Sequence, residues 1–151
     1  MKIFIGSDHR GTELKQEIIK CLEEDEFSVY NTKTPNSEVD DYPDFAFEVG
    51  ENVLKNEDAL GILICGNGIG ISIAANKVKG IRCARVLNED DAFKSKNHNG
   101  ANVIAIGADL PIEEAMEIIN VFISTKPASE ERHLKRINKI IKYENGEYNE
   151  L

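Results

Sequence analysis

The most distinctive run of residues in this sequence is a glycine-rich segment that begins with a cysteine. It reads Cys-Gly-Asn-Gly-Ile-Gly-Ile-Ser over residues 65–72, with glycines in alternate positions. Such spacing lets backbone N–H groups converge on an oxyanion at a helix N-terminus, and a thiol beside them can act as a general base. A glycine-rich turn with a structural cysteine is the simpler interpretation. The position of the segment at the end of a predicted strand favours the chemical one.

This segment differs from three known anion- and nucleotide-binding patterns. A cysteine phosphatase needs an arginine six residues after the nucleophile, where this chain has Ile71. A P-loop needs Gly-Lys-Ser/Thr at its end, and Gly70 is followed by the same isoleucine. That isoleucine also replaces the third glycine of a dinucleotide fingerprint, although Glu89 lies at a suitable distance for a ribose contact. Nucleotide binding therefore stays open as an alternative.

The histidines are the next candidates, and all three lie in polar segments: His9, His98 and His133. Histidines of an apolar core lie more often within apolar runs, although a neutral surface role is the alternative. His9 follows Asp8 at the end of the first predicted strand, and His98 precedes Asn99 at the end of a predicted helix. Because ligands bind beyond the carboxyl ends of parallel strands, we expect both segments to join the glycine loop there. No two histidines have the spacing of a helical ligand pair, so no metal site is expected.

Two arginines near the end of the chain could bind an anion together. Arg132 and Arg136 are one helical turn apart, so both guanidinium groups can contact one phosphate. A solvent-exposed charged face is the alternative, because Glu130 and Glu131 could pair with these cations.

The elements that must position these groups follow from the hydrophobic pattern. Strands are predicted at residues 2–6, 27–31, 60–65, 81–86 and 102–107. Apolar residues share one helical face between them, as in the sets Leu14, Ile18, Cys21, Leu22; Phe45, Val49, Val53; and Ile112, Ala115, Met116, Ile119, Phe122. The alternation predicts an α/β fold with a mainly parallel five-stranded sheet covered by helices on both faces. Residues 32–42 read as a surface loop before a helix near Pro43.

A final helix over residues 129–143 departs from this alternation. Its apolar positions Leu134, Ile137 and Ile141 face one way, and a basic stripe that includes Arg132 and Arg136 faces the other. Because this extra C-terminal helix lies outside the alternation, it can pack across an interface with another chain.

Composition limits the class of protein. The chain has 151 residues, an ordinary size for one domain, and we assign residues 1–151 to a single domain. It has 18 Lys and Arg residues against 27 Asp and Glu residues, a net charge of -9, so nucleic acid is not an expected partner. No segment approaches the roughly 18 consecutive apolar residues of a membrane span, and the N-terminus lacks a signal-peptide pattern. A cytoplasmic protein is expected.

The cysteine usage fits that compartment. The three cysteines, Cys21, Cys65 and Cys83, are odd in number and without CxxC spacing, which argues against a disulfide framework and a structural zinc site. Cys21 lies on the apolar face of its predicted helix and is expected in the core, and Cys83 lies within a strand. A thiol at a strand end, such as Cys65, is expected to contribute little to the core.

Taken together, these motifs resemble the type B ribose-5-phosphate isomerases and the related galactose-6-phosphate isomerase subunits. The matching segments follow one another from Met1 to about Ile141: Gly6–His9, Asp41–Pro43, Ile64–Lys77, Gly80–Arg82, His98–Asn99, Asn102–Val103, and Arg132–His133 with Arg136. The tail at residues 143–151 lies outside the resemblance.

The resemblance implies a Rossmann-like three-layer α/β/α subunit. It also implies a homodimer or homotetramer with active sites at the subunit interface, acting on a sugar phosphate without metal or organic cofactor. The expected reaction is the interconversion of ribose 5-phosphate and ribulose 5-phosphate through an enediolate. A six-carbon aldose 6-phosphate, such as that of galactose or allose, is the alternative substrate. A non-catalytic module that binds a nucleotide or sugar phosphate is the alternative from another class.

By position, the resemblance makes Cys65 the base that moves the proton and His98 the acid that helps to open the furanose ring. The other implied site residues bind the substrate: Asp8 and Asn99 at its hydroxyls; Gly66, Asn67, Gly68, Ile69 and Gly70 as the oxyanion hole; His9, Arg132 and Arg136 at its phosphate; and Tyr42. The residues agree with this chemistry, because an enediolate needs a base near its carbon and fixed donors near its oxygens.

Two departures from the family pattern affect the implied site. The family often has Thr or Ser where Asn67 stands, so an amide replaces a hydroxyl near the substrate. The family also often has a phosphate-binding arginine after the glycine of the fifth strand, where this chain has Asp109. An unpaired carboxylate there would repel a phosphate, so the grip on phosphate or the length of the substrate is expected to differ.

Overall fold

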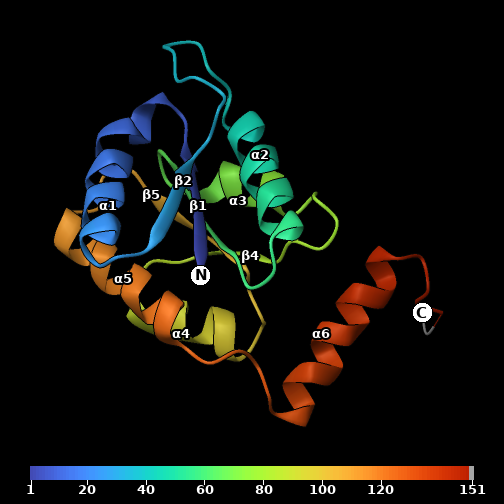
Figure 1. Ribbon diagram of the computed structural model, residues 1–151. Helices are drawn as coiled ribbons and strands as arrows, with labels where there is room; N and C mark the ends of the chain where they lie inside the picture. The colour runs from blue at the N-terminus through green and yellow to red at the C-terminus, as the bar shows by residue number, and fades with distance from the viewer. Residues whose placement is uncertain (150–151) are drawn as a thin grey trace.

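The apolar runs of the sequence form a parallel sheet in the computed structural model, which describes residues 1–149 (Figure 1). The strands are β1 (Lys2–Ser7), β2 (Ser28–Asn31), β3 (Leu60–Cys65), β4 (Cys83–Arg85) and β5 (Val103–Gly107). Their order across the sheet is β2-β1-β3-β5-β4, and every neighbouring pair is parallel. The carboxyl ends of all the strands therefore lie at one edge of the sheet, which we call the carboxyl edge; the opposite edge is the amino edge.

Helices cover both faces of this sheet (Figure 1). On one face lie α1 (Thr12–Glu24), α4 (Glu89–Asn97) and α5 (Ile112–Ser124), and on the other α2 (Tyr42–Lys55) and α3 (Ile69–Ala75). A short 3-10 turn, η1 (His9–Gly11), follows β1. The expected three-layer α/β/α fold is confirmed.

The alternation of side chains along the central strands produces two apolar cores. In β3, Ile62 and Ile64 face α1 and α5, whereas Leu63 and Cys65 face α2 and α3. Cys65 is thus part of a core, and the expectation that it contributes little there is wrong. Cys21 is only half-buried and belongs to neither core, so the expectation of a core position for it is wrong as well.

The largest difference from the predicted strands is at β4. A strand was expected over residues 81–86, but β4 contains only three residues. The Asn102 side chain replaces a sheet contact before β4, because its Oδ1 accepts from the Arg82 N–H at 2.9 Å and its Nδ2 donates to the Gly80 carbonyl at 3.0 Å. Side-chain pairing of this kind ends a strand early.

The last helix, α6 (Glu131–Glu144), stands apart from the three layers and is joined to α5 by an extended segment (Figure 1). Only His133 and Ile137 of this helix are buried. Of the tail at 143–151, the last two residues lie outside the described residues. Within residues 1–149, no helix is long and apolar enough to cross a membrane.

Candidate active site

The glycine loop that follows β3 is held against β5. The Ala108 N–H donates to the Cys65 carbonyl at 2.9 Å, which joins the two strand ends. Gly68 adopts a φ of 79°, and a Cβ atom there would lie 3.1 Å from the carbonyl carbon of Ile106. Both the positive φ and the close backbone approach require glycine at this position. The backbone of the loop is therefore packed directly against that of β5.

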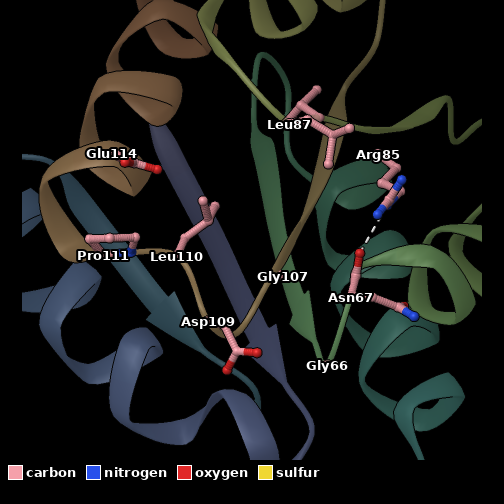
Figure 2. Close-up of a pocket in the computed structure, with 10 residues that line it drawn as sticks. Gly66, Asn67, Arg85, Leu87, Gly107, Asp109, Leu110, Pro111 and Glu114 are labelled. Atoms are coloured by element: carbon pink, nitrogen blue, oxygen red, sulfur yellow. Dashed lines mark hydrogen bonds between the residues drawn. The ribbon is translucent and has the colours of Figure 1, made fainter.

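Asn67 organises the loop through both its side chain and its backbone. Its Oδ1 accepts from the Ile69 N–H at 3.0 Å. The Ile69 N–H, one of the predicted oxyanion donors, is therefore already used within the loop. Its carbonyl accepts from the Arg85 Nε at 2.9 Å (Figure 2). Arg85 escaped the sequence analysis because a lone arginine at a strand end carries no motif.

The predicted base, Cys65, is only 4% exposed and faces the layer formed by α2 and α3. Tyr42, the first residue of α2, lies over the loop, since a Cβ atom on Gly70 would be 2.6 Å from its ring. Arg10 lies over the other end, because a Cβ atom on Gly66 would be 2.5 Å from its guanidinium group. The loop thus has a phenol on one side and a cation on the other, and the cation was missed by the sequence analysis.

The segment after β1 joins the loop at the carboxyl edge. The Asp8 N–H donates to the Ile64 carbonyl at 3.3 Å, and the buried Asp8 carboxylate accepts from the Arg10 N–H at 3.1 Å. The neighbouring His9 is held by a carboxylate from the loop before α2, with its Nδ1 2.7 Å from the Asp40 Oδ1. The structure therefore brings Asp8, His9, Tyr42 and the glycine loop together, as expected.

A pocket of about 330 Å³ lies between the glycine loop and the start of α5 (Figure 2). Arg85 and Asn67 line one side of it, and Asp109 and Leu110 line the other. Asp109, which stands where the family often has an arginine, thus places a carboxylate beside the glycine loop, opposite the cation of Arg85. The thiol of Cys65 faces away from this pocket, into the other layer.

The remaining predicted site residues lie elsewhere. His98 follows the end of α4 and precedes β5, so it lies at the amino edge, whereas Cys65 pairs with Gly107 at the carboxyl edge. The five residues of β5 separate these edges by about 13 Å. The expectation that the His98 segment joins the glycine loop is therefore wrong within one chain.

At the amino edge, His98 contacts α6. Its ring stacks on that of His133, with ring centroids 4.3 Å apart and 16° between the planes. The Arg82 Nε supports the turn after His98 by donating to the carbonyls of Asn99 and Gly100, at 3.2 and 3.0 Å. Burial lowers the pKa of His133, and electrostatic interaction with the neighbouring His98 and Arg132 lowers it further. His133 is therefore a neutral partner for the His98 ring at neutral pH.

Arg132 and Arg136 extend from the same helix into solvent. Arg132 donates from Nε to the Glu130 carboxylate at 3.0 Å, an exposed pair of the kind the sequence suggested. The structure thus divides the predicted residues into two groups: a carboxyl-edge group around Cys65, and an amino-edge group that contains His98, Asn99, Arg132 and Arg136.

The fold and the glycine loop together define a class of protein: a Rossmann-like α/β/α protein with an anion-binding turn and a thiol at the carboxyl edge of its sheet. Among residues 1–149, no group of three His, Cys, Asp or Glu side chains is arranged to hold a metal ion. The family described as Ribose/Galactose Isomerase matches residues 3–140, and the chain belongs to it. The family expected from the sequence is confirmed.

Individual relatives agree. The chain is 41% identical over 144 residues to the probable ribose-5-phosphate isomerase B of Mycoplasma pneumoniae, which covers 94% of both chains. Among solved structures it is similar to ribose-5-phosphate isomerase B of Clostridium thermocellum, with a TM-score of 0.90, 42% identity, and coverage of 97% of this chain and 99% of that one. It is also similar to the enzyme from Mycoplasma genitalium with bound ribulose-5-phosphate, with a TM-score of 0.88, 42% identity, and coverage of 95% and 96%.

Proposed function

We propose that this chain interconverts ribose 5-phosphate and ribulose 5-phosphate as an aldose–ketose isomerase. The observation that carries the proposal is the preorganised glycine loop with a thiol at its first residue, in a chain 42% identical to an enzyme solved with bound ribulose-5-phosphate. A pentose phosphate has hydroxyls and one phosphate, which match the polar groups grouped around the loop.

The reaction moves one proton between two neighbouring carbons. Cys65, as thiolate, takes the proton from C2 of the open-chain aldose, and the electron pair forms the C1–C2 double bond of an enediolate. The loop N–H groups stabilise the negative oxygen as it forms, a contribution typically worth about 100-fold or more per donor. The thiol then returns the proton to C1, while the hydroxyl proton passes from the C2 oxygen to the C1 oxygen, which yields the ketose. Asp8 and Tyr42 hold substrate hydroxyls near the loop.

A second copy of the chain completes this site. His98, which would assist ring opening, lies at the amino edge, about 13 Å or more from the loop of its own chain. Arg132 and Arg136 lie on α6, whose His133 stacks on His98 there. Apolar side chains are exposed on both surfaces that a second chain would cover: Ile69 and Ile73 on α3, and Leu134 and Ile140 on α6. These support a homodimer or homotetramer with shared sites. The three free cysteines support a reducing, cytoplasmic location.

A coupled assay over five- and six-carbon aldose phosphates tests the substrate. We expect the highest kcat/KM with ribose 5-phosphate. A higher value with the 6-phosphate of galactose or allose would move the chain to the six-carbon branch. No turnover with any of them, together with tight nucleotide binding by calorimetry, would indicate a binding module in place of an enzyme.

Mixed oligomers test the shared site. Alone, the Cys65→Ala chain should be nearly inactive, and the Arg136→Ala chain should bind the substrate weakly. After subunit exchange, a mixed dimer has one site with both groups intact, so some activity should return. Mixing Cys65→Ala with Cys65→Ala is the control. Absence of recovery, with exchange demonstrated by mass spectrometry, would mean that each site is built from one chain.

A further inference from the structure

The loop from Thr32 to Asp41 holds a buried carboxylate that the proposed reaction does not use. The Asp40 side chain is only 6% exposed, although the loop itself lies at the surface. Nothing in the local sequence distinguishes it from the neighbouring Asp41. The contacts of Asp40 reach across the molecule to the residue that follows Asp8.

Four N–H groups surround the two oxygens of Asp40. Its Oδ1 accepts from the His9 backbone N–H at 3.1 Å and meets the His9 Nδ1 at 2.7 Å. Its Oδ2 accepts from the Asn36 Nδ2 and from the Ser37 N–H, both at 3.1 Å. An ionised carboxylate is an acceptor only, and this one has its acceptor sites filled by donors from two segments.

A buried lysine determines the orientation of the amide in this network. Lys15 of α1 is 3% exposed and donates from Nζ to the Asn36 Oδ1 at 2.7 Å. A lysine ammonium only donates, so the amide oxygen of Asn36 faces it and the amide nitrogen faces Asp40 and the Ser7 carbonyl. The positive charge of Lys15 also acts on Asp40. The charged neighbours along the chain are Asp8, Arg10 and Asp41.

The protonation of the network follows from these contacts. Burial acts to raise the pKa of Asp40, but the hydrogen bonds from His9, Asn36 and two backbone N–H groups outweigh it, and the pKa falls from 3.8 to about 2. Asp40 is therefore ionised at neutral pH. The His9 Nδ1 must then carry a hydrogen, and the other ring nitrogen, Nε2, remains for a ligand.

We propose that Asp40 is a positioning residue for the phosphate end of the site, holding the His9 ring by Nδ1 so that Nε2 meets the substrate phosphate. The proposal rests on the proposed function, because it takes the phosphate of a sugar phosphate as the ligand of His9. A phosphate dianion at Nε2 is bound best by the imidazolium form, with one N–H donated to Asp40 and one to the phosphate. The proton needed comes from the solvent or from the phosphate monoanion.

The chain offers a matched control at the other end of the same loop. Glu48 of α2 accepts from the Lys33 N–H and the Thr34 N–H, at 2.8 and 3.1 Å. Glu48→Ala therefore loosens the loop through the loss of a carboxylate, as Asp40→Ala does, but leaves the contact between Asp40 and His9 in place. A purely structural role of Asp40 predicts equal effects of the two substitutions.

Steady-state kinetics with ribose 5-phosphate separates these cases. Asp40→Ala should raise KM about tenfold with kcat within about twofold, because a charge-assisted contact to the phosphate is weakened. Glu48→Ala should change KM by less than about twofold. In a His9→Gln background, Asp40→Ala should have no further effect on KM, since the two residues act through one contact. An equal rise in KM for Glu48→Ala, or a full effect in the His9→Gln background, would overturn the proposal.

Nitrogen-15 NMR of the His9 ring gives a readout without turnover. The wild-type spectrum should show that Nδ1 of His9 carries the hydrogen, and in Asp40→Ala the Nδ1 signal should no longer be that of a nitrogen fixed in this form. If Asp40→Ala does not fold, Asp40→Asn keeps the size of the side chain, removes its negative charge and replaces one of the two acceptor oxygens with an NH2 donor. An unchanged ring in the variant would refute the positioning role. Wild-type protein with a protonated Nδ1 but no turnover would instead remove the proposed function and leave the contact between Asp40 and His9 standing.

Discussion

The two edges of the sheet carry the two halves of the proposed site, and they are built in different ways. At the carboxyl edge, the glycine loop is tied to β5 by backbone hydrogen bonds and leaves no room for a side chain at Gly68. At the amino edge, α6 is anchored by the ring of His133 and the side chain of Ile137, and its arginines extend into solvent.

The two groups differ in how precisely their atoms must be placed. Donors that stabilise a developing negative charge act best when they are fixed before the reaction, so the sheet itself holds them. Cations that grip a phosphate can be delivered by a separate helix, because a longer-range charge tolerates more movement. In the proposed oligomer, one chain therefore supplies the whole carboxyl-edge group, and the amino-edge group reaches that site from a second chain.

The largest expected effect is the loss of the thiol at the carboxyl edge. Cys65→Ala should lower kcat by roughly 100-fold to 10,000-fold, the usual contribution of a general base. It should also lower the free energy of unfolding by about 1 kcal/mol, because Cys65 lies in a core. Turnover measurements and urea denaturation test both parts.

Cys21→Ala is the control for that substitution. Because Cys21 is half-buried and outside both cores, activity per folded molecule and stability should change little, by about 0.5 kcal/mol or less. Near-normal turnover of Cys65→Ala would show that another group is the base, and Asp8 would be the next candidate.

A pair of glycines tests the rigidity of the carboxyl edge directly. Gly68 and Gly146 both have a positive φ, of 79° and 73°, but only Gly68 has backbone atoms where a Cβ would lie. Gly146→Ala should cost about 1 kcal/mol for its conformation alone, and Gly68→Ala roughly 2 kcal/mol more. Equal costs in urea denaturation would mean that the loop moves freely away from β5.

Ile137→Ala tests how loosely the amino-edge group is held. A Cβ on Gly100 would lie 3.1 Å from the Ile137 Cδ1, so this side chain is one of the contacts between α6 and the body. Its truncation should speed amide exchange in α6 by about tenfold at low protein concentration and leave β3 and β5 unchanged. Equal acceleration in β3 would show that α6 unfolds together with the sheet.

Acid should weaken the two edges in different pH ranges, and this is the smallest expected effect. The folded-state pKa of His133 is lowered, so its neutral form stabilises the fold, and that stability is lost as the pH falls below 6.5. The pKa of Asp40 is lowered from 3.8 to about 2, so its contribution is lost only as the pH falls below 3.8 towards 2. Amide exchange against pH should therefore show α6 loosening before residues 32–41. The reverse order would contradict the assignment.

The pattern of elements and the chemistry of the glycine loop could be predicted from the sequence. Alternating apolar residues in strands and helical faces such as that of Phe45, Val49 and Val53 specify local backbone geometry through burial. Glycines in alternate positions likewise predict a turn that needs a positive φ or the close approach of another backbone segment, and Gly68 has both. Both signals lie within a few neighbouring residues.

Other features were decided only by tertiary structure, because they join residues that are distant in the chain. Asp40 and His9 are 31 residues apart, and no periodicity relates a loop carboxylate to a histidine after a strand. The placement of His98 at the amino edge follows from the direction of β5 in the sheet. Cys65 is buried because it lies on the face of the sheet that α2 and α3 cover. Packing geometry, which local sequence does not encode, set all three.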